Sequence, residues 1–296
     1  MNQPISVSVI GPGALGGAII DLISRHNDFS LHSVWGREQA DCYFVKDATH
    51  KHPAEKPFPS QDKDLGNLII ISVPDDQIKD SANRLSETLI SWSKRSVIHL
   101  SGSLDNTVLD PLANKGVLTA TLHPLQTFTR GDKADRFDGI WFSLHGNDSL
   151  FPLLNQLIEP FYARSKVLTS EQKSAMHLAA VFASNYLVSL MDVVEQITLS
   201  EGIPDGLTML EPIVHQTIQN IFEKGPKHSL SGPVARGDRS TVLKHLKQLE
   251  DNPEYYKLYQ QLGLIAFQIA EASGQAVPSD IMAIRDIFES ESDSDE

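Results

Sequence analysis

Ile5-Ser-Val-Ser-Val-Ile10, followed directly by Gly11-Pro-Gly13-Ala-Leu-Gly16, is the stretch that decides the fold of this 296-residue chain. The first six residues are rich in β-branched and apolar side chains, which predicts a buried strand. The next six have G-x-G-x-x-G spacing, and the apolar residues after them predict a helix. A glycine turn between a strand and a helix is typical of a site where helix-start N–H groups hold a pyrophosphate.

Further apolar runs in the first half of the chain predict a sheet. They lie at residues 31–35, 68–73, 96–100, 117–122 and 140–144, and helical stretches such as 78–91 lie between some of them. Continuous apolar strands separated by helices indicate a mostly parallel sheet covered on both faces. The stretch 46–67 is polar and contains several prolines, so we expect a long surface loop there.

The second half of the chain is expected to be helical. Thr169-Ser-Glu-Gln172 matches a capping box and nothing breaks the helix before Gly202, so we expect one long helix that is buried on several sides. Further helices are expected after Pro204, Arg239, Asn252 and Pro278. The predicted fold is α/β, with an N-terminal Rossmann-like, mostly parallel sheet domain (1–160), an all-α C-terminal domain (161–288) and an acidic, disordered tail (289–296).

Composition argues against several classes of partner. The 25 basic and 38 acidic residues give a formal net charge of −13 without basic runs, a poor basis for binding nucleic acid or an anionic membrane. The lone Cys42 excludes a disulfide framework and fits a reducing compartment. No secretory signal and no metal-ligand spacing is visible. We therefore expect a cytoplasmic protein that acts on a small molecule, with no metal, nucleic acid or membrane as partner.

The predicted cofactor site begins at the glycine turn. Gly11, Gly13 and Gly16, with the first helical residues Ala14 and Leu15, are expected to hold the pyrophosphate.

Cofactor choice is expected to depend on the end of the second strand, Trp35-Gly36-Arg37, where an NAD site usually has an acid. Gly36 leaves room, and the Arg37 guanidinium suits a 2′-phosphate, so we predict NADP; Glu38 would supply the acid in a shifted register. Four residues that follow two later strands are expected near the nicotinamide: Val73, Pro74, Ser101 and Gly102.

Several motifs beyond the glycine turn carry a family resemblance. They are Ser72-Val-Pro-Asp75, His99-Leu-Ser-Gly-Ser103, His123-Pro-Leu-Gln-Thr-Phe128, the helix segment from His177 to Asn185, and Gly232-Pro-Val-Ala-Arg-Gly-Asp238. The set resembles the Rossmann-like NADP oxidoreductases with a C-terminal domain of unknown function. These are similar in plan to pyrroline-5-carboxylate reductases, prephenate dehydrogenases and 3-hydroxyacid dehydrogenases. The resemblance spans about residues 5–272. It implies a helical dimerisation domain and hence a homodimer, but no particular substrate. The 46–67 insert and the acidic tail depart from the common pattern, and we expect them to bear on regulation rather than chemistry.

The expected catalytic residues are His123, His177 and Asn185. His123 ends a strand before a proline, where imidazole can exchange a proton with a substrate, or can cap the strand through backbone hydrogen bonds. We predict that His177 is the general acid; a satisfied core histidine is the alternative. Ser184 and Asn185 would lie on roughly the same helix face. In the 3-hydroxyacid dehydrogenases the corresponding helix carries a lysine four residues before an asparagine, whereas here Lys173 precedes His177.

Substrate contacts are predicted from Ser184 and from the later loop. Arg236 could clamp a carboxylate bidentately, and Asp238 could contribute or could instead cap the following helix or pair with an arginine. The leading hypothesis is an NADP-dependent oxidoreductase that transfers hydride between nicotinamide and a small, carboxylate-bearing ketone, imine or alcohol. A prephenate dehydrogenase-like or pyrroline-carboxylate reductase-like reaction and a non-catalytic NADP sensor are the alternatives.

Overall fold

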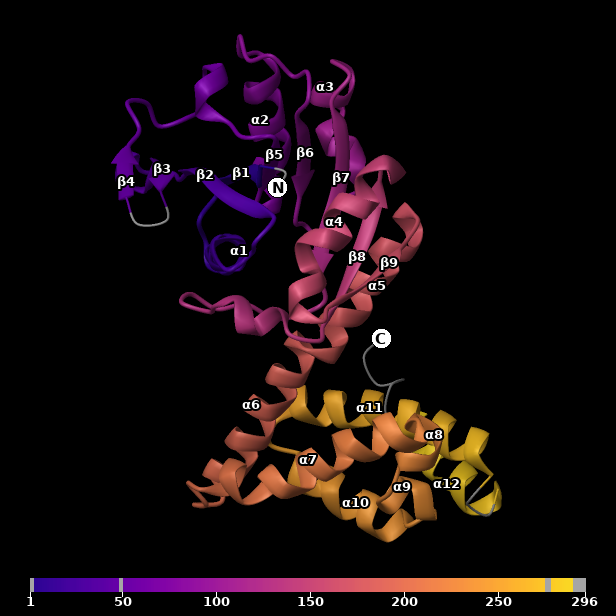
Figure 1. The fold of residues 1–296 in the computed structure, drawn as a ribbon. Coiled ribbons are helices and arrows are strands. Elements are labelled where there is room, and N and C mark those ends of the chain that lie inside the picture. Colours follow the sequence, from indigo (N-terminus) through magenta and orange to yellow (C-terminus); the bar gives the residue numbers. More distant parts are fainter. Residues whose placement is uncertain (1–2, 48–49, 275–277, 290–296) are drawn as a thin grey trace. The chain divides into compact units, whose positions relative to one another are not determined.

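The computed structural model describes residues 3–47, 50–274 and 278–289, which form two compact units (Figure 1). The N-terminal unit is Met1–Tyr186 and the C-terminal unit is Leu187–Glu296. The first unit ends later than the predicted boundary at residue 160, because the helix that follows Thr169 belongs to it. The predicted acidic tail lies outside the described residues from Ser290 onward.

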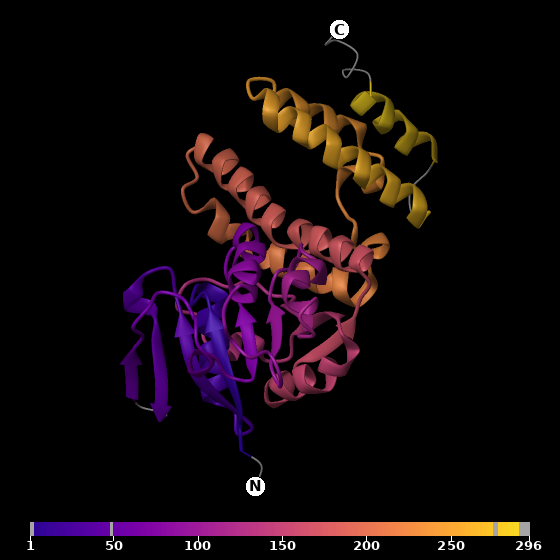
Figure 2. The same ribbon diagram turned by 90° about the horizontal axis from the view of Figure 1, so that it is seen from above.

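A nine-stranded sheet with the order β4-β3-β2-β1-β5-β6-β7-β8-β9 forms the centre of the N-terminal unit (Figure 2). Five neighbouring strands are parallel: β2 (Phe29–Trp35), β1 (Ile5–Ile10), β5 (Leu68–Ile71), β6 (Ser96–His99) and β7 (Leu118–Pro124). Their apolar side chains are buried because helices cover both faces. The Rossmann-like, mostly parallel sheet predicted from the sequence is confirmed.

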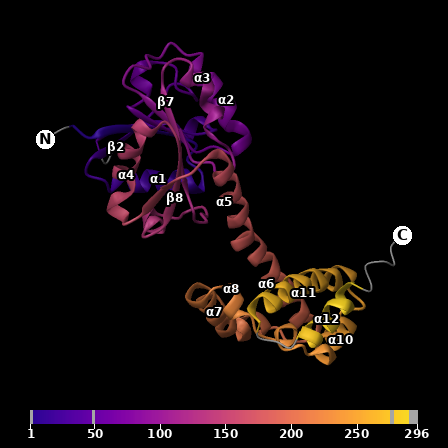
Figure 3. The same cartoon turned by 90° about the vertical axis from the view of Figure 1, so that its right-hand side faces the viewer.

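Figure 3 shows α2 (Asp75–Ser86) and α3 (Asp110–Ala113) on one side of this sheet, and α1 (Ala14–Ser24) and α4 (Phe151–Ile158) on the other. Two separate apolar clusters result, one under each pair of helices. Because the five parallel strands run the same way, the loops that follow them meet at one edge of the sheet.

The sheet has more strands than the sequence predicts, because its outer strands are polar. At one edge, β3 (Tyr43–Asp47) and β4 (His50–Pro53) form an antiparallel extension. At the other, β9 (Arg164–Val167) is added parallel to β8 (Trp141–Gly146), which is the strand predicted at 140–144 and runs antiparallel to β7. β4 is exposed along its whole length and β9 along most of it, so neither shows the apolar pattern on which the prediction relied.

The predicted surface loop over 46–67 was therefore wrong in part. After β4, the Asp64 carboxylate accepts hydrogen bonds from the backbone of Ser60 and Gln61, both within 2.9 Å. Arg95 then ties the end of the segment to the sheet by donating to Asp62 and to the carbonyl oxygens of residues 65 and 66. The insert is a folded part of the N-terminal unit.

The single long helix expected over 169–201 is instead two helices, α5 (Ser170–Ala183) and α6 (Asn185–Ser200). The predicted capping box of Thr169 and Gln172 is present at the start of α5. Ser184 breaks the helix, with φ −123° and ψ −67°, and its hydroxyl donates to the Ala180 carbonyl oxygen (2.6 Å) and to Asn185 Oδ1 (2.8 Å). A serine hydroxyl that bonds to nearby backbone offers an alternative to regular helix.

The predicted burial of this stretch is also wrong for the single chain. In α5 only Lys173 is buried, and in α6 no residue is. By length and composition alone, Ser170–Ser200 is the one helical stretch among the described residues that could cross a membrane. A helix that packs against another protein surface has the same composition.

The C-terminal unit contains the four later helices that were expected: α7 (Gly206–Lys224), α10 (Arg239–Gln248), α11 (Pro253–Ser273) and α12 (Pro278–Glu289). Two short helices that were not expected, α8 (Pro226–Ser229) and α9 (Pro233–Arg236), lie between α7 and α10. Side chains from α9 to α12 make its apolar core, which includes Val242, Phe267 and Phe288. Gly263 lets α11 and α12 approach, because a Cβ there would collide with the Phe288 ring.

Candidate active site

The turn after β1 requires its glycines. Gly11 has φ +97°, and a Cβ there would lie 2.6 Å from the Ser72 carbonyl oxygen. A Cβ on Gly16 would collide with the Gly11 carbonyl oxygen, so that glycine lets α1 pack against the turn. Nothing lies within 4 Å of a Cβ on Gly13, which leaves its backbone open to a ligand. The helix start and the open glycine fit a dinucleotide pyrophosphate.

A cavity of about 610 Å³ opens at this turn, within the usual size range of small-molecule sites. The glycine turn, the ends of β2 and β5, helix α2 and the insert line it. Three guanidinium groups line it, from Arg37, Arg84 and Arg130, against two carboxylates, from Glu38 and Asp41. The cavity therefore suits a ligand that carries several negative charges.

Two details of this cavity differ from the sequence-based expectation. Gly36 does not leave empty space, because the side chain of Asp41 packs against it. The insert, expected to bear on regulation, contributes Pro57 and Phe58 to the lining. The Arg84 guanidinium lies 3.8 Å from the centre of the Phe58 ring, a cation–π contact that holds it at the cavity.

Two imidazoles meet over Gly102 in the loop after β6. A Cβ on Gly102 would lie 2.5 Å from His177 Nδ1 and 2.6 Å from His123 Nε2, so any larger residue there would displace the rings. His123 comes from β7 and His177 from α5, and their ring centroids are 6.0 Å apart. The sequence predicted both histidines as proton-transfer groups, and the structure brings them together in one unit.

His123 is held as a neutral imidazole with a free lone pair. Its Nδ1 lies 2.9 Å from the Leu100 carbonyl oxygen, which can only accept, so Nδ1 carries the proton. Nε2, the atom beside Gly102, is then the acceptor of the neutral ring. The pKa of His123 is lowered to about 4, chiefly by burial, with a smaller contribution from the nearby positive charge of Lys173. The strand-capping alternative and the catalytic one are thus compatible, because each uses a different nitrogen.

Sequence reasoning missed Lys173, which occupies the centre of this cluster. Its side chain is 2% exposed, and Nζ donates to the carbonyl oxygens of Ser101 (2.6 Å), Gly102 (2.8 Å) and Leu104 (2.6 Å). Burial lowers its pKa to about 8. Its place one helical turn before His177 was visible in the sequence, but a lysine near a helix start usually lies at the surface.

The comparisons with known proteins agree with this architecture. The Rossmann-like domain family matches residues 1–124, and the family called domain of unknown function DUF2520 matches residues 140–265. The chain is a Rossmann-like protein with a DUF2520 domain. No match was found among curated protein sequences.

Solved structures share this fold at low sequence identity. A Bacteroides fragilis protein whose name assigns it to the NADP oxidoreductases is 21% identical, with a TM-score of 0.70 over 90% of this chain and 98% of its own. An imine reductase from Myxococcus stipitatus in complex with NADP+ is 15% identical, with a TM-score of 0.58 over 94% and 98%. The pyrroline carboxylate reductase of Plasmodium falciparum with NADP bound is 12% identical, with a TM-score of 0.56 over 96% and 100%.

The remaining residues predicted for the cofactor occupy different places in the N-terminal unit. Val73 and Pro74 line the large cavity. Ala14 and Leu15 form the first turn of α1. The Ser101 hydroxyl turns into its own loop, where it accepts hydrogen bonds from the backbone of Ser103 (3.2 Å) and Leu104 (3.1 Å).

Most of the residues that were predicted to bind the substrate form hydrogen bonds with residues next to them in the chain. Ser184 and Asn185 bond to each other at the helix break. In the DUF2520 domain, Asp238 caps α10 by accepting from Thr241 N (3.1 Å), Thr241 Oγ1 (2.7 Å) and Ser240 Oγ (2.9 Å). These bonds lower the pKa of Asp238 to about 2. The structure thus gives Asp238 the alternative, capping role. Arg236 is exposed at the end of α9.

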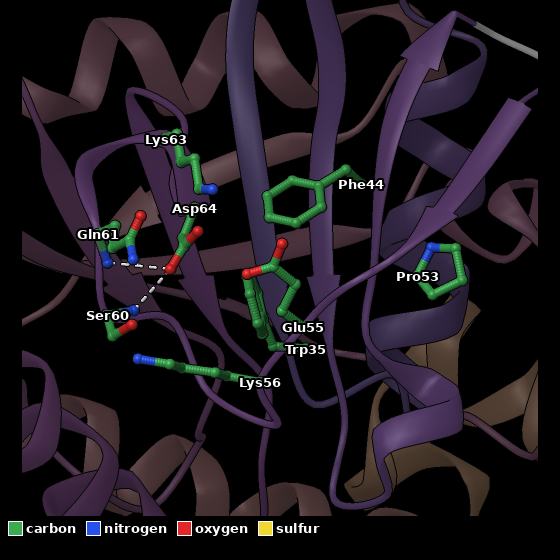
Figure 4. Close-up of a pocket in the computed structure, with 9 residues that line it drawn as sticks. All are labelled: Trp35, Phe44, Pro53, Glu55, Lys56, Ser60, Gln61, Lys63 and Asp64. Carbon is green, nitrogen blue, oxygen red and sulfur yellow. Dashed lines mark hydrogen bonds between the residues drawn. The ribbon is translucent and has the colours of Figure 1, made fainter.

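A second cavity of about 300 Å³ lies against the insert (Figure 4). It is lined by Trp35 and Phe44, whose rings meet edge to face, and by charged residues that include Lys56 and Lys63. It shares only Trp35 with the large cavity and contains none of the glycine turn or the histidines. We assign the chemistry to the larger cavity and the histidine pair. Among the described residues, no group of three or more His, Cys, Asp or Glu is placed to hold a metal ion.

Proposed function

We propose that this protein is an NADP-dependent oxidoreductase that transfers hydride between nicotinamide and a small, carboxylate-bearing ketone, imine or alcohol. The observation that carries the proposal is the meeting of His123 Nε2 and His177 Nδ1 over Gly102, in a loop at the edge where β1, β5, β6 and β7 end. When bound, the nicotinamide would supply or accept the hydride, and the protein must handle the accompanying proton.

The two histidines divide the proton handling between them. His123 is neutral near pH 7 and presents an unprotonated Nε2, so it acts as hydrogen-bond acceptor or as base in the direction of alcohol or amine oxidation. His177 is only half-buried, so solvent can reach its ring. In the direction of reduction, His177 donates the proton to the substrate oxygen or nitrogen. Prephenate dehydrogenase-like and pyrroline-carboxylate reductase-like reactions are special cases of this chemistry.

The preference for NADP over NAD rests on charge at the large cavity. Arg37 follows β2 and is exposed at the cavity, where its guanidinium can reach a 2′-phosphate. Arg84 and Arg130 add two more positive charges. The acids Glu38 and Asp41 would favour a free ribose hydroxyl, so the arginines are proposed to dominate. NADP in the names of several structural neighbours supports this choice.

We further propose that Arg236 of the DUF2520 domain holds the substrate carboxylate, as a guanidinium can do with two parallel hydrogen bonds. The reaction is proposed to take place in the cytoplasm, in keeping with one buried, unpaired cysteine.

A homodimer is proposed from the apolar surface of α6 and α7 in the C-terminal unit. Large apolar side chains along these helices are widely exposed in the single chain, among them Val188 (71%), Met209 (70%), Ile213 (61%) and Phe222 (86%). Monomeric proteins rarely expose apolar patches of this extent, and one self-complementary patch suffices for a two-fold dimer.

The experiment that tests the function measures NADPH oxidation with a panel of keto acids and cyclic imines. Turnover of at least one member, together with loss of turnover in His177→Asn, supports the proposal. Tight NADPH binding without turnover on any member would instead favour the alternative, a non-catalytic NADP sensor.

A further inference from the structure

Lys173 is a buried cation whose three donors are all used within the chain. An ammonium has three N–H groups. Here they point to three carbonyl oxygens of one loop, those of Ser101, Gly102 and Leu104, at 2.6–2.8 Å. A group that must give a proton to a substrate needs a free donor within reach of it. The geometry leaves Lys173 no such donor.

The loop that Lys173 holds is the one that carries Gly102. Within the loop, the Ser101 hydroxyl accepts a hydrogen bond from the backbone N–H of Ser103. The Ser103 hydroxyl donates to Asp75 at the start of α2. Lys173 connects this loop to α5 through three bonds, and the Ser170 hydroxyl at the start of α5 adds one to the Asp105 carboxylate just after the loop (3.3 Å). Four residues later on the same face of α5 lies His177, so one side chain fixes the loop against the helix that presents the histidine.

We propose that Lys173 is a positioning residue, which clamps the backbone of residues 101–104 so that Gly102 lies beneath both imidazoles. The inference rests on the proposed function, because it concerns the same proton-transfer pair. In this role the ammonium does not act on the substrate. It fixes the loop by hydrogen bonds, and its positive charge lowers the pKa of His123.

The charge environment supports this role. Two carboxylates, those of Asp75 and Asp105, face the ammonium and favour its charged form, while burial disfavours it. The imidazoles of His99 and His123 face it as well, and its positive charge helps to hold the pKa of both below the ordinary value. Burial is the main reason that His123 is neutral, and the fixed cation adds to it, which helps to keep Nε2 free to accept a hydrogen bond.

The first test follows the histidines of the intact protein by NMR. Because the pKa of Lys173 is about 8, the ring signals of His123 and the backbone amide of Gly102 should shift between pH 7 and 9. In Lys173→Gln, which is neutral but keeps two N–H donors, that shift should disappear and the pKa of His123 should rise from about 4. An unchanged His123 titration in this variant, or no shift of these signals in the natural protein, would overturn the proposal.

The second test uses Lys173→Met, which has a similar length but neither charge nor donors. We expect kcat to fall about 100-fold, as for a displaced catalytic group, with the NADPH affinity within about threefold, because the loop does not line the large cavity. Lys166→Met, on exposed strand β9, is the matched control and should change neither. If kcat falls while the His123 and Gly102 signals stay in place, Lys173 acts directly on the substrate and the proposal is wrong.

The two tests separate this proposal from the proposed function. NMR titration and cofactor binding need no turnover. A panel without any substrate would therefore count against the function, while the signals of His123 and Gly102 would still decide the role of Lys173. If Lys173→Met does not fold, Lys173→Gln and the titration of the natural protein give the same decision.

Discussion

Replacing Gly102 with alanine should disable the histidine pair with little effect on the rest of the fold. The added Cβ would lie 2.5 Å from His177 Nδ1 and 2.6 Å from His123 Nε2, whereas ordinary contacts begin at 3.4 Å. The rings must therefore give way by roughly 0.8–0.9 Å, comparable to the misplacement of about 1 Å that can cost a factor of about 100 in rate. His123 cannot move freely, because its Nδ1 is bonded to the Leu100 carbonyl oxygen.

The assay for Gly102→Ala combines kinetics, unfolding and NMR. We expect kcat/KM to fall about 100-fold with the best substrate of the panel. The free energy of unfolding should fall by about 1–2 kcal/mol, since overpacking costs roughly 1–3 kcal/mol and alanine restricts the unfolded chain. The pKa of His123 should rise from about 4 as its ring moves toward solvent.

A matched glycine provides the control. Gly17 lies in α1, and a Cβ there meets nothing within 4 Å. Gly17→Ala should therefore keep the kinetics and gain about 0.5–1 kcal/mol of stability. Unchanged kcat/KM and an unchanged His123 titration in Gly102→Ala would refute the packing of the two rings over this glycine.

Four further outcomes are expected. Gly13→Asp should abolish NADPH binding without unfolding the protein, because its carboxylate would face the pyrophosphate; calorimetric titration and circular dichroism measure both. Arg37→Ala should weaken NADPH much more than NADH, since only NADPH carries the 2′-phosphate, and equal losses would give Arg37 a structural role. His99 is fully buried with a pKa of about 4 against 6.5 when unfolded, so its stabilising effect is present above pH 6.5 and is lost as the pH falls toward 4; between pH 7 and 4.5 the free energy of urea unfolding should fall by about 2–3 kcal/mol more in the natural protein than in His99→Gln, while His123, with the same pKa, adds its own loss to both. Val188→Asp should convert a dimer into a 32.7 kDa monomer in light scattering with the fold intact, because Val188 is exposed in the single chain; a natural protein that is already monomeric would refute the dimer.

The strands and the glycine turn could be predicted because their physical signals are local. β1, β5 and β6 are short apolar runs, and the glycines of the turn sit at fixed spacing directly after β1. The edge strands β4 and β9 could not be predicted, since half or more of their side chains face solvent and only the neighbouring strand defines them.

The site was predictable only in part, for a related reason. His123 could be assigned because a strand before it and a proline after it fix its place at the sheet edge. Lys173 could not, because its burial depends on three carbonyl oxygens about 70 residues earlier in the chain. For Asp238 the sequence indicated two possible roles, binding the substrate or capping α10. The hydrogen bonds from Ser240 and Thr241 favour the capping role.

The insert forms part of the wall of the large cavity. Its residues Pro57 and Phe58 line the cavity, and the Phe58 ring supports the guanidinium of Arg84. Arg84 comes from α2, which belongs to the common core of the sheet domain, so the insert acts by holding a core residue in place rather than by adding a charge of its own. Asp64 braces the insert internally by accepting from the backbone of Ser60 and Gln61, and Arg95 ties its end to the rest of the unit by donating to the carbonyl oxygens of residues 65 and 66. The polar segment that the sequence predicts as a surface loop is therefore part of the wall of this cavity.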